Sequence, residues 1–117
     1  MHWVLVIDDE KSITKMLTLA FTRAGFNVDV AANGKKGIDK YNKRNFDVVI
    51  TDIRMPGING NGVVRDIKKS NRPNTPVIGM SGTPWELLNE KFDEVLPKPF
   101  SLMALVKTIQ NVCYNSL

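Results

Sequence analysis

The fold is decided by the stretch Val4–Glu10, which reads VLVIDDE, four apolar residues followed by three acids. A continuous apolar run of this kind is typical of a strand that is buried on both faces, as in a parallel sheet. Two later segments have a similar layout, VVITD at Val48–Asp52 and VLPKP at Val95–Pro99. Residues at the carboxyl ends of parallel strands converge at one edge of the sheet, so we expect the charged side chains at these three ends to meet. These side chains are Asp8, Asp9, Asp52 and Lys98.

Carboxylates that gather in one crevice repel one another, and such a cluster persists when a hard cation lies among its oxygens. The three aspartates therefore predict a Mg²⁺ site that takes part in phosphoryl chemistry. The only histidine, His2, lies outside any cluster of polar residues in the sequence. A histidine metal site and a Ser-His-Asp arrangement are thereby excluded.

The bulk composition is that of a small globular domain. The chain has 117 residues, 43% of them hydrophobic and 24% charged, so we expect a single domain over residues 1–117. Its only cysteine is Cys113, so no internal disulfide forms, which favours a reducing compartment. No apolar run approaches the length of a membrane span, and the first residues show no signal-peptide pattern. We therefore expect a cytoplasmic protein with no membrane contact.

The formal net charge of +4 is less informative. The basic residues gather mostly in two expected helical stretches, where we interpret them as solvated helix faces. No nucleic-acid recognition module is visible, so we expect no direct binding of nucleic acid. A basic surface can still steer an acidic protein partner. The residues concerned are Lys35, Lys36, Lys40, Lys43, Arg44, Arg65, Lys68, Lys69 and Arg72.

Strand and helix patterns alternate five times along the chain, which predicts a parallel sheet with helices on both faces. The expected strands are Trp3–Ile7, Val28–Ala31, Asp47–Thr51, Val77–Met80 and Val95–Leu96. The expected helices are Lys11–Ala24, one that opens at Asn33-Gly34, one that contains Val63–Ile67, a short one that opens at Thr83–Glu86, and one capped by Ser101. The short helix begins with a capping box, Thr83-Pro84-Trp85-Glu86.

The order and spacing of several motifs make the chain similar to a known family. The motifs are VIDDE at Val6–Glu10, ANG at Ala32–Gly34, DVVITDIRMPG at Asp47–Gly57, Gly60, MSG at Met80–Gly82 and LPKPF at Leu96–Phe100. Together they resemble the receiver domain of the response regulators of two-component signalling, over essentially the whole chain. The resemblance implies a flavodoxin-like, doubly wound five-stranded sheet of order 2-1-3-4-5.

The resemblance also assigns roles to the charged residues. Asp52 is the implied phosphoacceptor, since a carboxylate at a strand end can attack a phosphoryl group and become an acyl phosphate. Mg²⁺ is the implied cofactor, held by Asp9, Asp52 and the backbone carbonyl of Arg54, with Asp8 completing the site directly or through water. Because Mg²⁺ keeps several waters, few protein ligands are needed.

Two further residues are implied to bind the phosphoryl group. Lys98 would pair with the phosphoryl oxygens as a point charge, and Ser81 would donate its hydroxyl to one of them. The resemblance also implies a cis peptide bond between Lys98 and Pro99, which turns the lysine into the site. An X-Pro bond is cis in only about 5–6% of cases, so this expectation depends on the resemblance.

The implied function is a signalling switch. A sensor histidine kinase or a histidine phosphotransfer protein would supply the phosphoryl group, and the modified surface would control a protein target or an output domain. The domain would catalyse its own phosphorylation and dephosphorylation without being a turnover enzyme. No output domain follows Leu117, so we expect either a stand-alone regulator or a piece of a longer protein, and both readings stay open.

Three alternatives compete with this reading. A phosphohydrolase of the haloacid-dehalogenase type also uses a strand-end aspartate, but it needs a carboxylate two residues later, where this chain has Arg54. A nucleotide-binding fold is the second, yet the glycine-rich run Gly57–Gly62 matches neither G-x-G-x-x-G nor a P-loop. The third is a docking module with the same fold that is never phosphorylated, against which the complete acidic pocket argues.

Two positions depart from the family pattern. The segment between Ser81 and Lys98 is a few residues shorter than usual, which predicts a truncated fourth helix. Val95 stands where the family usually has an aromatic residue in the fifth strand. The sequence therefore leaves open how a signal would reach the surface.

Overall fold

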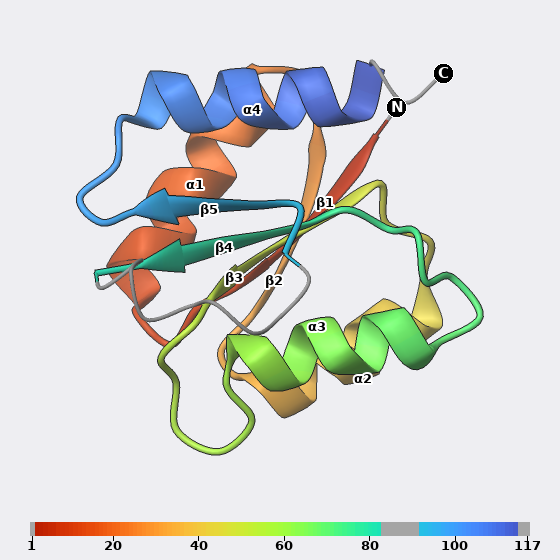
Figure 1. Ribbon diagram of the computed structural model, residues 1–117. Coiled ribbons are helices and arrows are strands. Elements are labelled where there is room, and N and C mark those ends of the chain that lie inside the picture. The colour runs from red at the N-terminus through yellow and green to blue at the C-terminus, as the bar shows by residue number, and fades with distance from the viewer. Residues whose placement is uncertain (1, 83–91, 115–117) are drawn as a thin grey trace.

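The computed structural model of the protein describes residues 2–82 and 92–114, which form a parallel sheet between two layers of helices (Figure 1). The strands are β1 Trp3–Ile7, β2 Asn27–Ala31, β3 Val48–Asp52, β4 Val77–Ser81 and β5 Glu94–Pro97. They pair in parallel in the order β2-β1-β3-β4-β5. The predicted doubly wound, flavodoxin-like sheet of order 2-1-3-4-5 is thereby confirmed.

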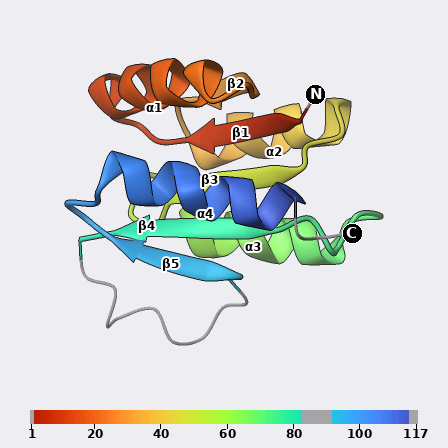
Figure 2. The ribbon, with the colours of Figure 1, turned by 90° about the horizontal axis from the view of Figure 1, so that it is seen from above.

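Helices cover both faces of the sheet (Figure 2). They are α1 Lys11–Arg23, α2 Gly34–Lys43, α3 Gly60–Lys69 and α4 Leu102–Tyr114. Leu17 and Phe21 of α1 pack with Leu105 and Ile109 of α4 in one buried cluster. Side chains of α2 and α3 pack in a second cluster against the opposite face. Within the described ranges, no helix combines the length and the apolar character that crossing a membrane requires.

The expected elements differ from the observed ones mainly at their ends. The third strand starts at Val48 rather than Asp47, because the Asp47 carboxylate accepts a hydrogen bond from the backbone N–H of Trp3 (2.7 Å). The fifth strand is one residue longer at each end than expected. The short helix expected from Thr83–Glu86, with Trp85, falls outside the described residues.

Helix ends follow the capping residues that the sequence offers. The Asn33 side chain accepts a hydrogen bond from the N–H of Lys36 at the start of α2 (2.8 Å), and Asn59 does the same for Gly62 at the start of α3 (3.1 Å). Gly25, just after α1, has a φ of 94°, a left-handed conformation that glycine adopts without strain. Local sequence thus fixes where these helices begin and end.

Two aspartates align the strands at their amino ends, opposite the carboxyl ends that carry the acidic residues. The Asp47 N–H donates to the carbonyl of Trp3 (2.9 Å), which complements the bond that its carboxylate accepts. Asp93 repeats the arrangement on β4, since its carboxylate accepts from the N–H of Val77 (2.7 Å) and its own N–H donates to the Val77 carbonyl (2.9 Å). Each pair fixes the register of two neighbouring strands, and thereby the relative positions of their carboxyl ends.

Side chains also cover the outer edge of β2. The Asp29 carboxylate accepts a hydrogen bond from the backbone N–H of Val30 (2.9 Å). The Lys40 ammonium group donates to the Val30 carbonyl (2.6 Å) and pairs with Asp29 (2.8 Å). Both backbone groups of Val30 are therefore satisfied inside the molecule, as is common for edge strands that must not pair with another chain.

The start of α3 lies directly on the backbone at the end of β3. The N–H of Gly60 donates to the carbonyl of Ile53 (3.0 Å). A Cβ atom at Gly60 would lie 2.6 Å from the carbonyl oxygen of Asp52 and 2.8 Å from the Cα atom of Ile53. Only glycine allows this approach, so the helix can support the end of the strand that carries Asp52.

Gly60→Ala should lower the free energy of unfolding by roughly 1–3 kcal/mol, because the new methyl group meets backbone that cannot turn aside. Gly62→Ala, in the same helical turn, is the matched control. Its methyl group would meet the Ile58 side chain, at 2.8 Å from Cγ2, which can rotate away. We expect the control to change stability by less than about 1 kcal/mol. Urea unfolding of the two variants checks this, and equal losses would contradict the contact.

Candidate functional site

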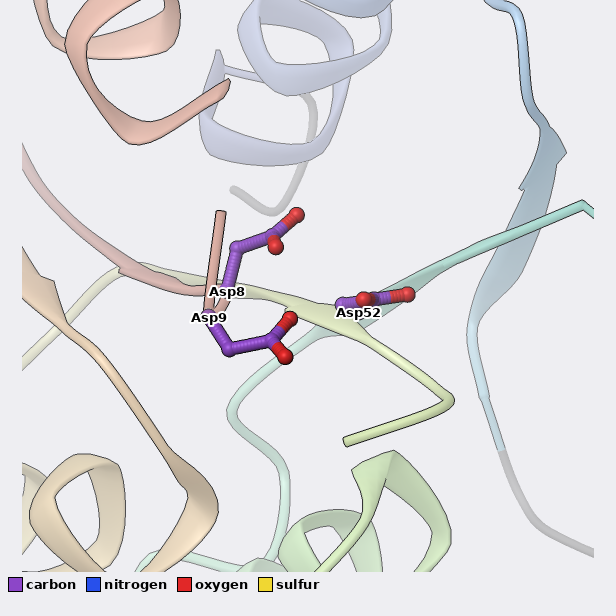
Figure 3. A group of neighbouring side chains, drawn as sticks. All are labelled: Asp8, Asp9 and Asp52. Atoms are coloured by element: carbon purple, nitrogen blue, oxygen red, sulfur yellow. The ribbon is translucent and has the colours of Figure 1, made fainter. Parts of the chain in front are cut away.

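The ends of β1 and β3 bring three carboxylates together. Ile7 pairs with Thr51 in the parallel ladder, so the residues that follow them lie side by side. Asp8, Asp9 and Asp52 each offer a carboxylate oxygen, and these oxygens all lie within 4.8 Å of one another (Figure 3). The convergence expected from the parallel sheet is therefore present in the structure.

The three aspartates differ in their exposure. Asp8 is 1% exposed and Asp52 is 6% exposed, whereas Asp9 is open to solvent. The Asp8 carboxylate accepts a hydrogen bond from the N–H of Glu10 (2.9 Å), which fixes its orientation. Asp9 borders a surface pocket of about 580 Å³ that the start of α2 and the loop before α3 also line. A ligand can therefore approach the cluster from the side of Asp9.

Lys98 reaches the same cluster from the end of β5. Its N–H donates to the carbonyl of Ser81 (2.7 Å), and the peptide bond between Lys98 and Pro99 is cis, as the resemblance implies. Its ammonium nitrogen lies 3.3 Å from Asp8 Oδ2 and 3.4 Å from Asp52 Oδ1. The lysine thus bridges the two buried carboxylates.

Glu10 is a further member of the site that the sequence analysis did not assign. Its carboxylate oxygen Oε1 lies 3.9 Å from the ammonium nitrogen of Lys98, and its side chain is mostly exposed. The signal in the sequence was its place in the acidic run Asp8-Asp9-Glu10. A solvent-exposed ion pair at this distance contributes little to the stability of the fold. Glu10 therefore mainly adds negative charge at the rim of the site.

Burial dominates the electrostatics of the two inner carboxylates. It raises the pKa of Asp8 above its ordinary value of 3.8, although the Glu10 N–H and the charge of Lys98 lower it. The pKa of Asp52 is raised for the same reason, again against the opposing charge of Lys98. For Lys98, burial lowers the pKa, but the charges of Asp8 and Asp52 outweigh it and the pKa lies above 10.5. Removing these carboxylates from water is thus only partly offset by the lysine.

The donor set fits Mg²⁺. Three carboxylates offer the hard oxygen ligands that this ion prefers, and the exposed side of the cluster leaves room for the waters that it retains. A divalent cation would also relieve the repulsion among the aspartates. Arg54, whose backbone carbonyl was the fourth expected ligand, follows Asp52 by two residues and is exposed. Its role as a ligand stays a prediction.

Ser81 ends β4 next to Asp52, and it is 2% exposed. The ladder pairs Asp52 with Met80 and Ser81 with Pro97, so Ser81 lies between the strand that carries Asp52 and the one that leads to Lys98. The structure therefore brings Ser81 to the same edge as the acidic cluster. Its expected hydrogen bond to a phosphoryl oxygen stays a prediction.

Known proteins are similar to this chain in sequence. The family model of the response regulator receiver domain matches residues 4–110. The response regulator ArlR of Staphylococcus aureus is 30% identical over an alignment of 117 positions, which covers 96% of this chain and 52% of that protein. The chain spans about half the length of the curated relatives that it matches.

Two solved structures are similar over nearly the whole chain. The receiver domain of the Francisella response regulator 1452 has a TM-score of 0.91 and 31% identity, and each chain is covered completely. The response regulator TrrA of Thermotoga maritima, solved in complex with Mg²⁺ and BeF, has a TM-score of 0.86 and 30% identity and covers 96% of this chain and 99% of its own.

The family match, the sheet order and the acidic cluster agree with one another. Phosphorylation of an aspartate with Mg²⁺ at an acidic site is general in the matched family, whose members interact with histidine kinases and output domains. The chain belongs to the response regulator receiver domain family of two-component systems.

Proposed function

We propose that this domain is a phosphorylation-dependent switch in which Asp52 accepts a phosphoryl group from the histidine of a sensor kinase or a phosphotransfer protein. The observation that carries the proposal is the position of the Asp52 carboxylate. It lies at the end of a central strand, beside two other carboxylates and 3.4 Å from the ammonium group of Lys98. The modified surface would act on a protein target or an output domain.

The residues of the site match what phosphoryl transfer requires. An oxygen of Asp52 attacks the phosphorus atom, a new P–O bond forms, and the bond from phosphorus to the histidine nitrogen breaks. Lys98 lies where its charge can stabilise the phosphoryl oxygens. Asp8 and Asp9, together with Asp52, would hold Mg²⁺, which supplies charge neutralisation and alignment of the phosphoryl oxygens when bound. Ser81 would donate its hydroxyl to the attached group.

The domain modifies itself rather than turning over a substrate. Its nucleophile is its own carboxylate, so each chain takes up one phosphoryl group and is spent until the acyl phosphate is hydrolysed. The position two residues after Asp52 holds Arg54 in place of the acid that a haloacid-dehalogenase hydrolase would need. We therefore prefer the switch to the hydrolase.

Incubation with acetyl phosphate and Mg²⁺ should add a single phosphate to the protein, seen by intact-mass measurement. Asp52→Asn should show no adduct, because an amide oxygen is a poor nucleophile, while Asp66→Asn, which changes an exposed acid of α3, should keep it. An adduct of full yield on Asp52→Asn would refute the assignment. Release of phosphate over many turnovers without a change of mass would favour a hydrolase, and an unmodified wild type would favour the docking module.

Mg²⁺ at ten times its dissociation constant should raise the free energy of unfolding by about 1.4 kcal/mol, because it binds only the folded site. Asp9→Asn should lose most of this gain. Asp39→Asn is the control, since Asp39 lines the same surface pocket as Asp9 but is not part of the carboxylate cluster. Urea unfolding with and without Mg²⁺ measures the effect. A wild type that is indifferent to millimolar Mg²⁺ would contradict the metal site.

Without metal, Asp8→Asn should raise the free energy of unfolding at neutral pH. The pKa of Asp8 is raised above 3.8 in the folded state, so at a pH above that raised pKa the ionised carboxylate lowers the free energy of unfolding. Below pH 3.8 Asp8 is protonated in both the folded and the unfolded protein, and this cost disappears. Asparagine does not ionise, and its advantage should therefore shrink as the pH falls toward 3.8. Urea unfolding in EDTA between about pH 4 and 7 tests this. A difference that does not vary with pH would speak against it.

A further inference from the structure

A glycine in the middle of β4 leaves a gap that two side chains fill. Gly79 is buried among the other residues of this strand. A Cβ atom at Gly79 would lie 2.7 Å from Ile53 Cδ1 and 3.1 Å from both Cδ1 and Cε1 of Phe92. The isoleucine that follows Asp52 and an aromatic ring from just before β5 therefore both border the space over this glycine. Val95, which pairs with Gly79 in the ladder, contributes only a small side chain.

The backbone next to Phe92 is held by hydrogen bonds. Its neighbour Asp93 makes two hydrogen bonds with the backbone of Val77, at 2.7 and 2.9 Å, and lies 3.8 Å from the ammonium group of Lys68 in α3. The ring itself is half-buried and packs against the cluster between the sheet and the α2–α3 layer. The strand start and α3 thus hold the ring over the centre of β4.

Ile53 connects this packing to Asp52. Its N–H donates to the carbonyl of Met80 (3.1 Å), and its carbonyl accepts from Gly60 at the start of α3 (3.0 Å). Its side chain is 3% exposed. The backbone of Ile53 is therefore fixed on both sides, while the end of its side chain borders the space at Gly79 that Phe92 also borders. One peptide unit separates Ile53 from Asp52.

We propose that Phe92 is a positioning residue for Asp52, acting through Ile53 over the gap at Gly79, and that modification of Asp52 alters the packing of Phe92 in return. The proposal rests on the proposed function of Asp52. The return effect follows from linkage, since a contact that favours one state of the site is itself favoured by that state. The ring would give the site a direct connection to the surface at the start of β5.

A double-mutant cycle tests the first half. Gly79→Ala should displace both Ile53 and the ring, and Phe92→Leu should enlarge the space that the ring and Ile53 border. Each should slow the formation of the phosphate adduct from acetyl phosphate at saturating Mg²⁺ by up to about tenfold, as small misplacements at a reacting centre do. In the double variant the methyl group that Gly79→Ala adds fills part of the space left by the smaller side chain at position 92. The rate of adduct formation should therefore recover toward that of the wild type.

Phe26→Leu is the matched control. It makes the same substitution at a buried aromatic residue of the other cluster, just before β2, and should lower the melting temperature without changing the adduct rate. Single variants that react at the wild-type rate, or a double variant whose loss is the sum of the two, would overturn the positioning role. A wild type that forms no adduct would instead remove the proposed function, and this inference with it.

Hydrogen exchange tests the return effect. The amide of Asp93, which donates to Val77, should change its exchange rate when beryllofluoride and Mg²⁺ are added to the wild type. The change should be reduced in Phe92→Leu. The amide of Asn27 lies at the start of β2, far from the acidic cluster, and donates to the carbonyl of His2. It should not respond. An Asp93 amide that exchanges equally with and without the mimic would overturn the return effect.

Discussion

The structure depends on one electrostatic constraint, the burial of the Asp8 and Asp52 carboxylates with a single ammonium group between them. Their pKa values stay raised even with Lys98 at 3.3 and 3.4 Å, so the lysine compensates for only part of the burial. A folded protein tolerates such a cost when the same groups are needed for binding. A bound divalent cation would relieve the remaining cost.

Strand register and close packing at glycines position the side chains of the site. Asp47 and Asp93 fix strand register at one edge of the sheet, and the carboxyl ends at the other edge follow from it. Gly60 brings α3 onto the backbone beside Asp52, and Gly79 lets Ile53 and Phe92 share the space over β4. Glycines therefore lie at two of the positions where other elements closely approach Asp52 and Ile53.

Sequence reasoning predicted a parallel sheet and the meeting of Asp8, Asp9, Asp52 and Lys98, because apolar runs indicate buried strands and the carboxyl ends of parallel strands lie at one edge of the sheet. The strand order 2-1-3-4-5 came from the resemblance to the family. Sequence reasoning placed the start of β3 one residue early, since a backbone-binding role of the Asp47 carboxylate depends on a distant strand. The cis bond before Pro99 came from resemblance, as local chemistry favours trans. The position of Glu10 in the acidic run was a signal in the sequence, but its approach to Lys98 and the gap at Gly79 depend on tertiary contacts that no spacing in the sequence reveals.

The pairing of Asp29 and Lys40 along β2 has a consequence for how copies of this domain meet. Because both backbone groups of Val30 are already bonded within the chain, a neighbouring strand finds no open hydrogen-bonding ladder at this position. Contacts between two domains at Val30 must therefore be made by side chains. Such contacts require no rearrangement of the sheet, so this end of β2 can take part in an interface without any change in the fold.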